Sequence, residues 1–332
     1  MTPTEPAVAL HFDVLPEWEQ LPAGMNHDDV VGVCVDSRDR LFMLTRRESR
    51  VLVYDRDGTC LDHWGEGLLT ERTHGLTVAP DDTVYVVDEG AHVVYHTDDR
   101  GEVLGVIGQR GQPSDSGYDG QNLDTIVRGG GPFNRPTNVA VAPSGDLYVS
   151  DGYGNCQVHR FTADGALIDS WGEPGTGPGQ FHLVHGVTVA ANGEVLVADR
   201  ENDRIQVFTP EGVYLREWTD VQRPTNVRLD ADGNVYVSEL WRRASEPSRR
   251  LGPQPDRPGR VSVFDPAGVL LARWGGPQRT EPGNFIAPHD ICVDSNGDVY
   301  VGEVSYTYAV SRGHVAPPVH TFQKFARRGS SA

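Results

Sequence analysis

Three histidines open short stretches of similar sequence and could together bind a metal ion. His74 begins HGLTV, His185 begins HGVTV and His289 begins HDICV. Three imidazoles around one point are the protein ligands of an open zinc site, which keeps its remaining position free for water or a substrate. Each histidine alone is more often a hydrogen-bonded core residue, but one position repeated in three stretches favours a metal site. The choice of divalent ion stays open, because imidazoles bind several of them.

These stretches belong to six repeated units that predict the fold. The units begin at Val30, His74, Thr137, His185, Thr225 and His289. Each unit contains four short runs of strand-forming residues separated by polar, glycine-containing turns. Four short antiparallel strands in about 40 residues are typical of a propeller blade. We therefore expect an all-β fold, a six-bladed β-propeller that forms a single domain over residues 1–332.

The repeat is incomplete at one end and interrupted in three places. The sixth unit lacks a clear fourth strand, and ALHFDVLPEW near the N-terminus has strand character without a unit of its own. We expect residues near 9–18 to supply the outer strand of the last blade, which removes an open sheet edge. The interruptions, expected on the rim, are residues 109–134, 241–260 and 305–318. Long loops are usually functional or disordered, so a role in covering a substrate stays open.

The place of the histidines in their units explains how they could meet. The first strand of each propeller blade lines the central channel, so equivalent positions on alternate blades lie about 120° apart around one axis. Histidine stands there in units two, four and six, whereas the other units have Val31, Thr137 and Thr225. The second strand of each blade returns to the face of the propeller at which the first strand begins. Its end therefore borders the same central depression as the histidines, which we call the basin. Those ends carry the candidate site residues Arg46, Tyr153 and Arg200.

Composition limits the partners and the compartment. The 332 residues carry a formal net charge of −18, from 47 acidic and 29 basic side chains. This balance argues against a nucleic-acid partner, which needs a basic surface. No apolar run approaches the roughly 20 residues that cross a bilayer, and the start MTPTEPAVALHF lacks the pattern of a secretory signal. Four cysteines without paired spacing fit a reducing compartment, so we expect a cytoplasmic protein without a membrane partner.

The sequence resembles peptidyl-α-hydroxyglycine α-amidating lyase, a six-bladed propeller of NHL-type repeats. The resemblance covers residues 32–325 and is clearest in the stretches RPTNVAVAPSGDLYVSDGYGNCQV, PGQFHLVHGVTV, VADRENDRIQVF and APHDICVDSNGDVYV. One departure is Gly154, which stands where the animal enzymes have a cysteine, so the disulfide made by that cysteine is absent.

The resemblance implies two metal sites and a set of catalytic side chains. The ligands of a catalytic zinc would be His74, His185 and His289. A structural calcium would be held by backbone oxygens of Val33 and Leu76 and by the carboxylate of Asp290. The catalytic side chains would be Tyr153, Arg200 and Arg46, with both arginines also binding the substrate.

The implied activity is a C–N lyase reaction on a carbinolamide, R-CO-NH-CH(OH)-R′. Zinc would bind and acidify the hydroxyl, Tyr153 would act as the base, and Arg200 would bind a substrate carboxylate bidentately. The products would be an amide and an aldehyde, which is glyoxylate when the substrate is an α-hydroxyglycine. The substrate would be a peptide or a small molecule. A separate hydroxylating enzyme is expected upstream, because this chain shows no second domain.

Other functions stay open on the sequence alone. The rim insertions would suit a related metal-dependent lyase or hydratase that acts on a small molecule or natural product. A calcium-dependent lactonase or a streptogramin-type lyase would share the fold, and Asn138 and Asn226 stand at channel positions that such a lactonase would use. A non-catalytic NHL propeller that binds a protein partner is a further alternative, although it does not need three channel histidines. Tightly bound zinc would argue against the last two alternatives.

Overall fold

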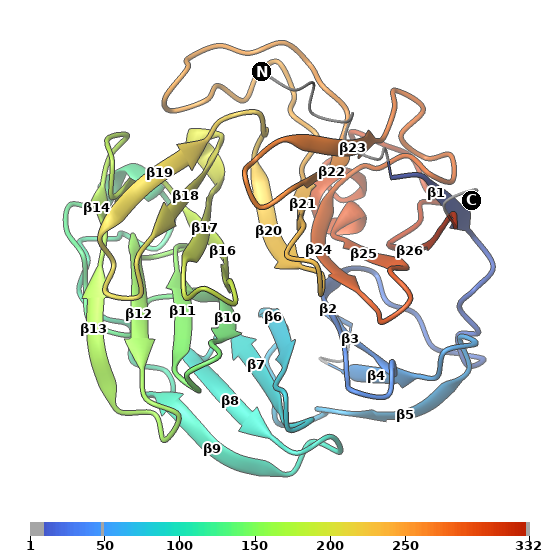
Figure 1. Cartoon of the computed structure of the whole chain (residues 1–332), viewed down its shortest axis with the longest axis horizontal. Helices are drawn as coiled ribbons and strands as arrows, with labels where there is room; N and C mark the ends of the chain where they lie inside the picture. Colours follow the sequence, from blue (N-terminus) through green and yellow to red (C-terminus); the bar gives the residue numbers. More distant parts are fainter. Residues whose placement is uncertain (1–9, 48–49, 330–332) are drawn as a thin grey trace, which may run out of the picture.

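The computed structural model describes residues 10–47 and 50–329 and shows an all-β propeller. Within these residues, six four-stranded antiparallel sheets surround one axis (Figure 1). The innermost strands are the first strands of the six repeated units, β2, β6, β10, β16, β20 and β24 (Figure 1). The predicted six-bladed fold with four strands per blade is therefore confirmed.

In each blade the strands follow one another from the axis to the rim. Blade 1 contains β2 (Val30–Val35), β3 (Leu41–Thr45), β4 (Val51–Tyr54) and β5 (Cys60–Trp64). Blade 2 contains β6 (Thr73–Val78), β7 (Val84–Asp88), β8 (Val93–Thr97) and β9 (Val103–Gly108). Blade 3 contains β10 (Pro136–Val141), β11 (Leu147–Asp151), β12 (Gln157–Phe161) and β13 (Leu167–Trp171).

The second half of the ring repeats this order. Blade 4 contains β16 (Val184–Val189), β17 (Val195–Asp199), β18 (Arg204–Phe208) and β19 (Tyr214–Trp218). Blade 5 contains β20 (Pro224–Leu229), β21 (Val235–Glu239), β22 (Arg260–Phe264) and β23 (Leu270–Trp274). Blade 6 contains β24 (Pro288–Val293), β25 (Val299–Glu303), β26 (Phe322–Arg327) and β1 (Phe12–Leu15). A short parallel pair, β14 (Glu173–Pro174) and β15 (Gln180–Phe181), lies between blades 3 and 4 in the sequence.

The N-terminal strand closes the ring as predicted. β1 pairs antiparallel with β26, with Phe12 opposite Arg327 and Leu15 opposite Lys324. Figure 1 shows β1 beside the C-terminus on the outer edge of blade 6. The edge of β26 is therefore covered by a strand from the opposite end of the chain.

The second strand of each blade provides the rigid support for the innermost strand. These strands consist largely of valine and other strand-forming residues, and each is buried along its whole length. The apolar clusters join residues of neighbouring blades, for example Val139 and Val149 of blade 3 with Val87 of blade 2. Such close-packed contacts hold side chains on the inner strands in defined positions.

Every innermost strand carries a β-bulge at the same place. The pairing of the first two strands skips one residue in each blade, so that this residue has no direct partner. The skipped residues are Val31, His74, Thr137, His185, Thr225 and His289. A bulge turns a side chain away from its regular direction. The three histidines are thus presented to the axis by a local distortion that all six blades share.

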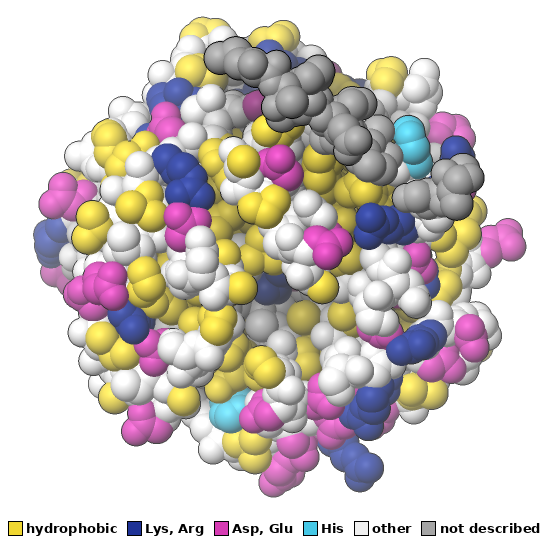
Figure 2. Space-filling model, viewed as in Figure 1, with side chains coloured by type: hydrophobic (Ala, Val, Ile, Leu, Met, Phe, Trp, Pro, Cys, Tyr) yellow, Lys and Arg dark blue, Asp and Glu magenta, His cyan; other side chains and the backbone are white. Residues whose placement is uncertain are grey.

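The three rim insertions are ordered and contact one another. The insertion 109–134 contains the short helix η1 (Leu123–Thr125), and 305–318 contains the π-helical turn η3 (Tyr306–Val310). An ion pair between Arg249 and Asp124 joins the insertion 241–260 to the first of these. A hydrogen bond from Tyr308 to Glu246 joins the insertion 241–260 to the insertion 305–318. Figure 2 shows one face of the disc, which is hollowed near the axis.

Residues 10–47 and 50–329 contain no helix with the length and hydropathy needed to span a membrane. The four cysteines are free, in agreement with the absence of a paired spacing. The cytoplasmic location stays a prediction.

Candidate metal centre

The structure brings His74, His185 and His289 together on the propeller axis. Their ring centroids lie 4.6–4.8 Å apart, and the candidate ligand nitrogens all lie within 4.8 Å of one another. All three side chains are buried. Alternate blades therefore deliver three imidazoles to one point, as their positions in the repeat predict.

The backbone of the next blade orients each imidazole. The Nδ1 atoms lie 2.7 Å from the carbonyl oxygen of Thr137 for His74, 2.7 Å from that of Thr225 for His185, and 2.8 Å from that of Val31 for His289. A carbonyl oxygen can only accept, so each Nδ1 carries the proton and each Nε2 has a free lone pair. This arrangement is the usual support of a metal-binding histidine.

Glycine follows two of the histidines because the next blade approaches closely there. A Cβ at Gly75 would lie 2.6 Å from the Thr137 carbonyl oxygen, and one at Gly186 would lie 2.8 Å from the Thr225 carbonyl oxygen. These oxygens are the acceptors for the imidazoles of His74 and His185. The His-Gly pair thus allows the approach that orients the ring.

The donor set fits a divalent metal ion. The Nε2 of His74 is buried and has no hydrogen-bond partner among the described residues, which is costly unless a ligand is bound. Burial and the neighbouring charges of Arg46 and Arg200 lower the pKa of His289 to about 3, and burial also lowers the pKa of His74 and of His185 well below the usual value. The imidazoles are therefore neutral, and the neutral form is the one that binds metal.

Tyr153 lies directly beside the histidines. Its hydroxyl is 3.2 Å from Nε2 of His185 and accepts a hydrogen bond of 3.0 Å from Nη1 of Arg200. Its ring packs edge-on against His74, with centroids 5.1 Å apart. The guanidinium carbons of Arg200 and Arg135 lie 5.4 and 5.7 Å from the ring centre. Two cations thus flank the Tyr153 ring, and one of them donates to its hydroxyl.

Two tight backbone approaches position these side chains. A Cβ at Gly152 would lie 1.9 Å from the Val184 carbonyl oxygen, so the turn before Tyr153 can pack against the strand that carries His185. The backbone N–H of Arg200 donates to the Leu183 carbonyl at 3.1 Å. Leu183 and Val184, just before His185, therefore contact both the turn that precedes Tyr153 and the loop that begins at Arg200.

Arg46 lies in the same basin but is held less firmly. Among residues 10–47 and 50–329 its acidic partner is Asp29, with Nη1 and Oδ2 3.9 Å apart. With Tyr153, Arg200 and His289 it lines a cavity of about 170 Å³. The three predicted side chains and one of the histidines, His289, thus line one small cavity.

Sequence reasoning missed two arginines of this face, the half-buried Arg135 and the buried Arg223. Each precedes the innermost strand of an odd-numbered blade and has a positive φ, 63° and 36° respectively. Arg135 donates from Nε to Glu89 at 2.7 Å, and Arg223 donates from Nη2 to Glu201 at 2.9 Å. Both arginines begin the same motif, RPTNV, and this repetition is the signal that could have revealed them.

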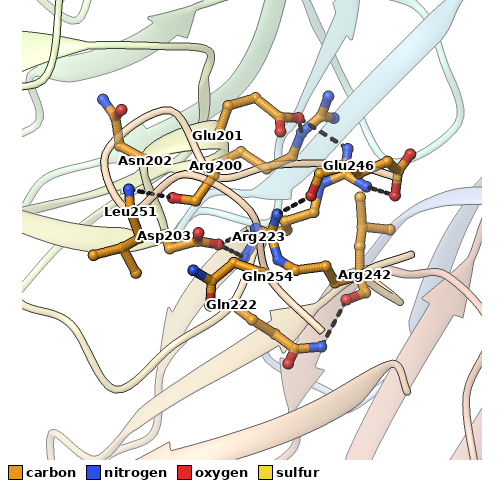
Figure 3. A network of polar contacts seen from close by, with 12 residues as sticks. Arg200, Glu201, Asn202, Asp203, Gln222, Arg223, Arg242, Glu246, Leu251 and Gln254 are labelled. Atoms are coloured by element: carbon orange, nitrogen blue, oxygen red, sulfur yellow. Dashed lines mark hydrogen bonds and ion pairs between the residues drawn. The ribbon is translucent and has the colours of Figure 1, made fainter. Parts of the chain in front are cut away.

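A polar network surrounds Arg200 and Arg223 (Figure 3). Glu201 lies between the two guanidinium groups and accepts a hydrogen bond from each. Burial by itself would raise the pKa of Glu201, but the two arginines outweigh it and hold the pKa far below the usual value. Glu201 is therefore an anion that keeps two cations in place.

The residues expected to hold calcium do not fit a calcium ion as they are arranged. Nη2 of Arg228 donates to the Leu76 carbonyl oxygen at 2.8 Å and lies 3.8 Å from Oδ2 of Asp290. Oδ2 of Asp290 accepts the backbone N–H of Val33 at 2.9 Å, and Oδ1 accepts from Asn226. A guanidinium thus lies where the expected ion would bind the Leu76 and Asp290 oxygens.

We expect removal of calcium to leave the thermal unfolding temperature of the wild-type protein unchanged. Arg228→Ala should lower it by about 5 °C or more, because it leaves the buried Asp290 without its cation. Added calcium should partly restore this variant, since hard oxygen ligands remain. Scanning calorimetry with and without a calcium-selective chelator checks this, with the exposed Arg100→Ala as control. A wild-type transition that falls on calcium removal would contradict the assignment.

Comparison with known proteins identifies the relatives of this chain. The NHL repeat family matches residues 133–161 and 181–208. Human NHL repeat-containing protein 3 is 30% identical over 290 residues, which cover 82% of this chain and 76% of that protein. The fruit-fly peptidyl-α-hydroxyglycine α-amidating lyase 1 is 28% identical over 280 residues, which cover 78% of this chain and 48% of the fly protein.

A solved structure supports the fold alone. A streptogramin B lyase superposes with a TM-score of 0.58 at 12% identity, over 96% of this chain and 98% of that one. The sequence matches are more specific than this likeness. The chain belongs to the family of NHL-repeat β-propellers that includes NHL repeat-containing protein 3 and the peptidyl-α-hydroxyglycine α-amidating lyases.

Proposed function

We propose that this protein is a metal-dependent C–N lyase. It cleaves a carbinolamide of the N-acyl-α-hydroxyglycine type to an amide and an aldehyde such as glyoxylate. The observation that carries the proposal is the convergence of three oriented imidazoles beside the Tyr153 hydroxyl, which itself accepts from Arg200. A relative named as an amidating lyase supports a lyase role.

The reaction is balanced without a co-reactant. R-CO-NH-CH(OH)-COO⁻ gives R-CO-NH₂ and OHC-COO⁻. The O–H and C–N bonds break, the C=O and a new N–H bond form, and the hydroxyl proton ends on the amide nitrogen. The site must therefore remove one proton from oxygen and return one to nitrogen.

Tyr153 is placed to move this proton. A divalent ion bound by the three imidazoles, for which zinc is the first candidate, would polarise the carbinol hydroxyl and make it more acidic. Tyr153, acting as general base and then as general acid, takes the hydroxyl proton and gives it to the departing nitrogen. The hydrogen bond from Arg200 and the guanidinium of Arg135 over the ring hold Tyr153 in place.

The cavity beside Tyr153 suits a small anionic group. Its lining contains four arginines and one glutamate, namely Arg46, Arg200, Arg223, Arg312 and Glu246. A volume of about 170 Å³ is the room of about six water molecules. This matches the α-hydroxyglycine head group, whose carboxylate Arg200 and Arg46 would bind. The acyl group, peptide or small, lies outside this enclosed part, and a separate hydroxylating enzyme would supply the substrate.

Elemental analysis of the purified protein beside His185→Ala tests the proposal. We expect about one zinc per chain in the wild type, loss of that zinc in the variant, and glyoxylate release from N-benzoyl-α-hydroxyglycine by the wild type only. The exposed His63→Ala should keep both metal and activity, since it removes an imidazole away from the axis. Absence from the wild type of any divalent ion that is lost in His185→Ala, or a bound ion without any carbinolamide cleavage, would overturn the lyase proposal. Calcium alone would favour a lactonase-like enzyme or a binding scaffold.

A further inference from the structure

We infer that Arg223 and Glu201 are positioning residues for Arg200, and that two rim insertions hold them in place through Tyr308 and Glu246. The inference rests on the proposed function, because Arg200 has its role in that reaction. It makes the insertions 241–260 and 305–318, whose residues Glu246 and Tyr308 also line the cavity, part of the catalytic apparatus.

Glu201 connects Arg200 to Arg223. Oε1 of Glu201 accepts from Nε of Arg200 at 2.9 Å and from Nη2 of Arg223 at 2.9 Å. With Nε directed at Glu201, Nη1 of Arg200 meets the Tyr153 hydroxyl at 3.0 Å. The direction of the Arg200 guanidinium therefore depends on where the Glu201 carboxylate is held.

Arg223 in turn contacts both insertions. Nη1 of Arg223 donates to Oε2 of Glu246 at 2.8 Å and to the Tyr308 hydroxyl at 2.7 Å. The Tyr308 hydroxyl also lies 2.6 Å from the Trp241 carbonyl oxygen. Glu246 and Trp241 belong to the fifth-blade insertion and Tyr308 to the sixth-blade insertion. Arg223 is thus fixed by both insertions at once.

A third contact fixes the backbone of the same glutamate. The N–H of Arg249, also in the fifth-blade insertion, donates to the Glu201 carbonyl oxygen at 2.9 Å. Figure 3 shows Glu201 and Arg200 on one side of Arg223 and Glu246 on the other. Since the side chains of Arg223 and Glu201 are only 7% and 13% exposed, water competes weakly for these bonds. Glu201 is therefore held at two places, its backbone carbonyl by Arg249 and its carboxylate by Arg223.

Tyr308→Phe tests the inference, because it removes one hydroxyl and keeps the ring. We expect kcat/KM for N-benzoyl-α-hydroxyglycine to fall about fivefold to tenfold, since small displacements of a positioning group are costly. In an Arg200→Gln background the same substitution should have almost no further effect, because the group through which it acts is gone. Zinc content should stay unchanged in all four proteins. Glu246→Gln is the second variant and should behave in the same way.

Tyr148→Phe is the matched control. Its hydroxyl bonds the Pro210 carbonyl oxygen at 3.0 Å, outside the cavity and the network, and its loss should leave kcat/KM unchanged. Equal losses from Tyr308→Phe with and without Arg200 would show a merely structural role and overturn the inference, as would full activity of both Tyr308→Phe and Glu246→Gln. Absence of glyoxylate release by the wild type is a different result, which removes the proposed function and the inference with it.

Discussion

Tyr153→Phe is expected to lower kcat for glyoxylate release by about 10³-fold, because general acid–base catalysis contributes about 10²–10⁴-fold. The variant keeps the ring between Arg200 and Arg135 but loses the hydroxyl that lies 3.2 Å from His185. Binding of the substrate does not need that hydroxyl, so KM should change little. Steady-state kinetics with N-benzoyl-α-hydroxyglycine, together with metal analysis of the same preparation, measure both quantities.

Tyr148→Phe again serves as the control, since it removes a phenol hydroxyl at a distance from the axis. Loss of metal from Tyr153→Phe would mean that the tyrosine supports the metal centre and would leave its role in proton transfer unsupported. Retained metal with nearly full kcat would exclude Tyr153 as the base.

The second large effect is expected for Arg200→Gln. Truncating one partner of a buried charge pair costs about 2–5 kcal/mol, so kcat/KM for a substrate with a carboxylate should fall by a factor between about 30 and about 5,000. The glutamine keeps much of the side-chain length but loses the charge and the fork of donors that bind a carboxylate. Arg223 remains as a partner for Glu201, so the fold should be retained.

The discriminating measurement compares two substrates on the same variant. N-benzoyl-α-hydroxyglycine should lose most of its kcat/KM, whereas its methyl ester should lose less, because the ester carries no charge for Arg200 to bind. Arg200→Lys, which keeps the charge without the fork, should fall between wild type and Arg200→Gln. Equal losses for acid and ester would show that Arg200 serves Tyr153 alone and does not bind the carboxylate.

The fold and the histidines could be predicted because both are repeated. A period of about 40 residues and a fixed turn chemistry identify a blade, and a histidine at one position of alternate blades can converge only on the axis. The bulge at His74, His185 and His289 was not visible in the sequence, yet it affects each blade in the same way. Repetition therefore made the convergence predictable without the bulge being known.

The surroundings of the site could not be predicted in the same way. Glu246 and Tyr308 lie in insertions that have no counterpart in other blades, so no repeat indicates where their side chains point. Arg228 was missed for another reason. It stands two residues after the channel residue Asn226, at a position where the other units have apolar or small residues. Its guanidinium reaches across the axis to the Leu76 carbonyl of the second blade, a contact between residues far apart in the sequence.

Closure of blade 6 by β1 has a consequence for how the chain folds during its synthesis. Phe12 pairs with Arg327, so β1 cannot join its sheet until β26 has been synthesised. Until β26 emerges from the ribosome, the other five blades can assemble, whereas β24 and β25 have no outer strand beside them. The three histidines come from blades 2, 4 and 6, so their arrangement is complete only after blade 6 has joined the ring. Metal binding at these imidazoles would therefore follow closure of the ring.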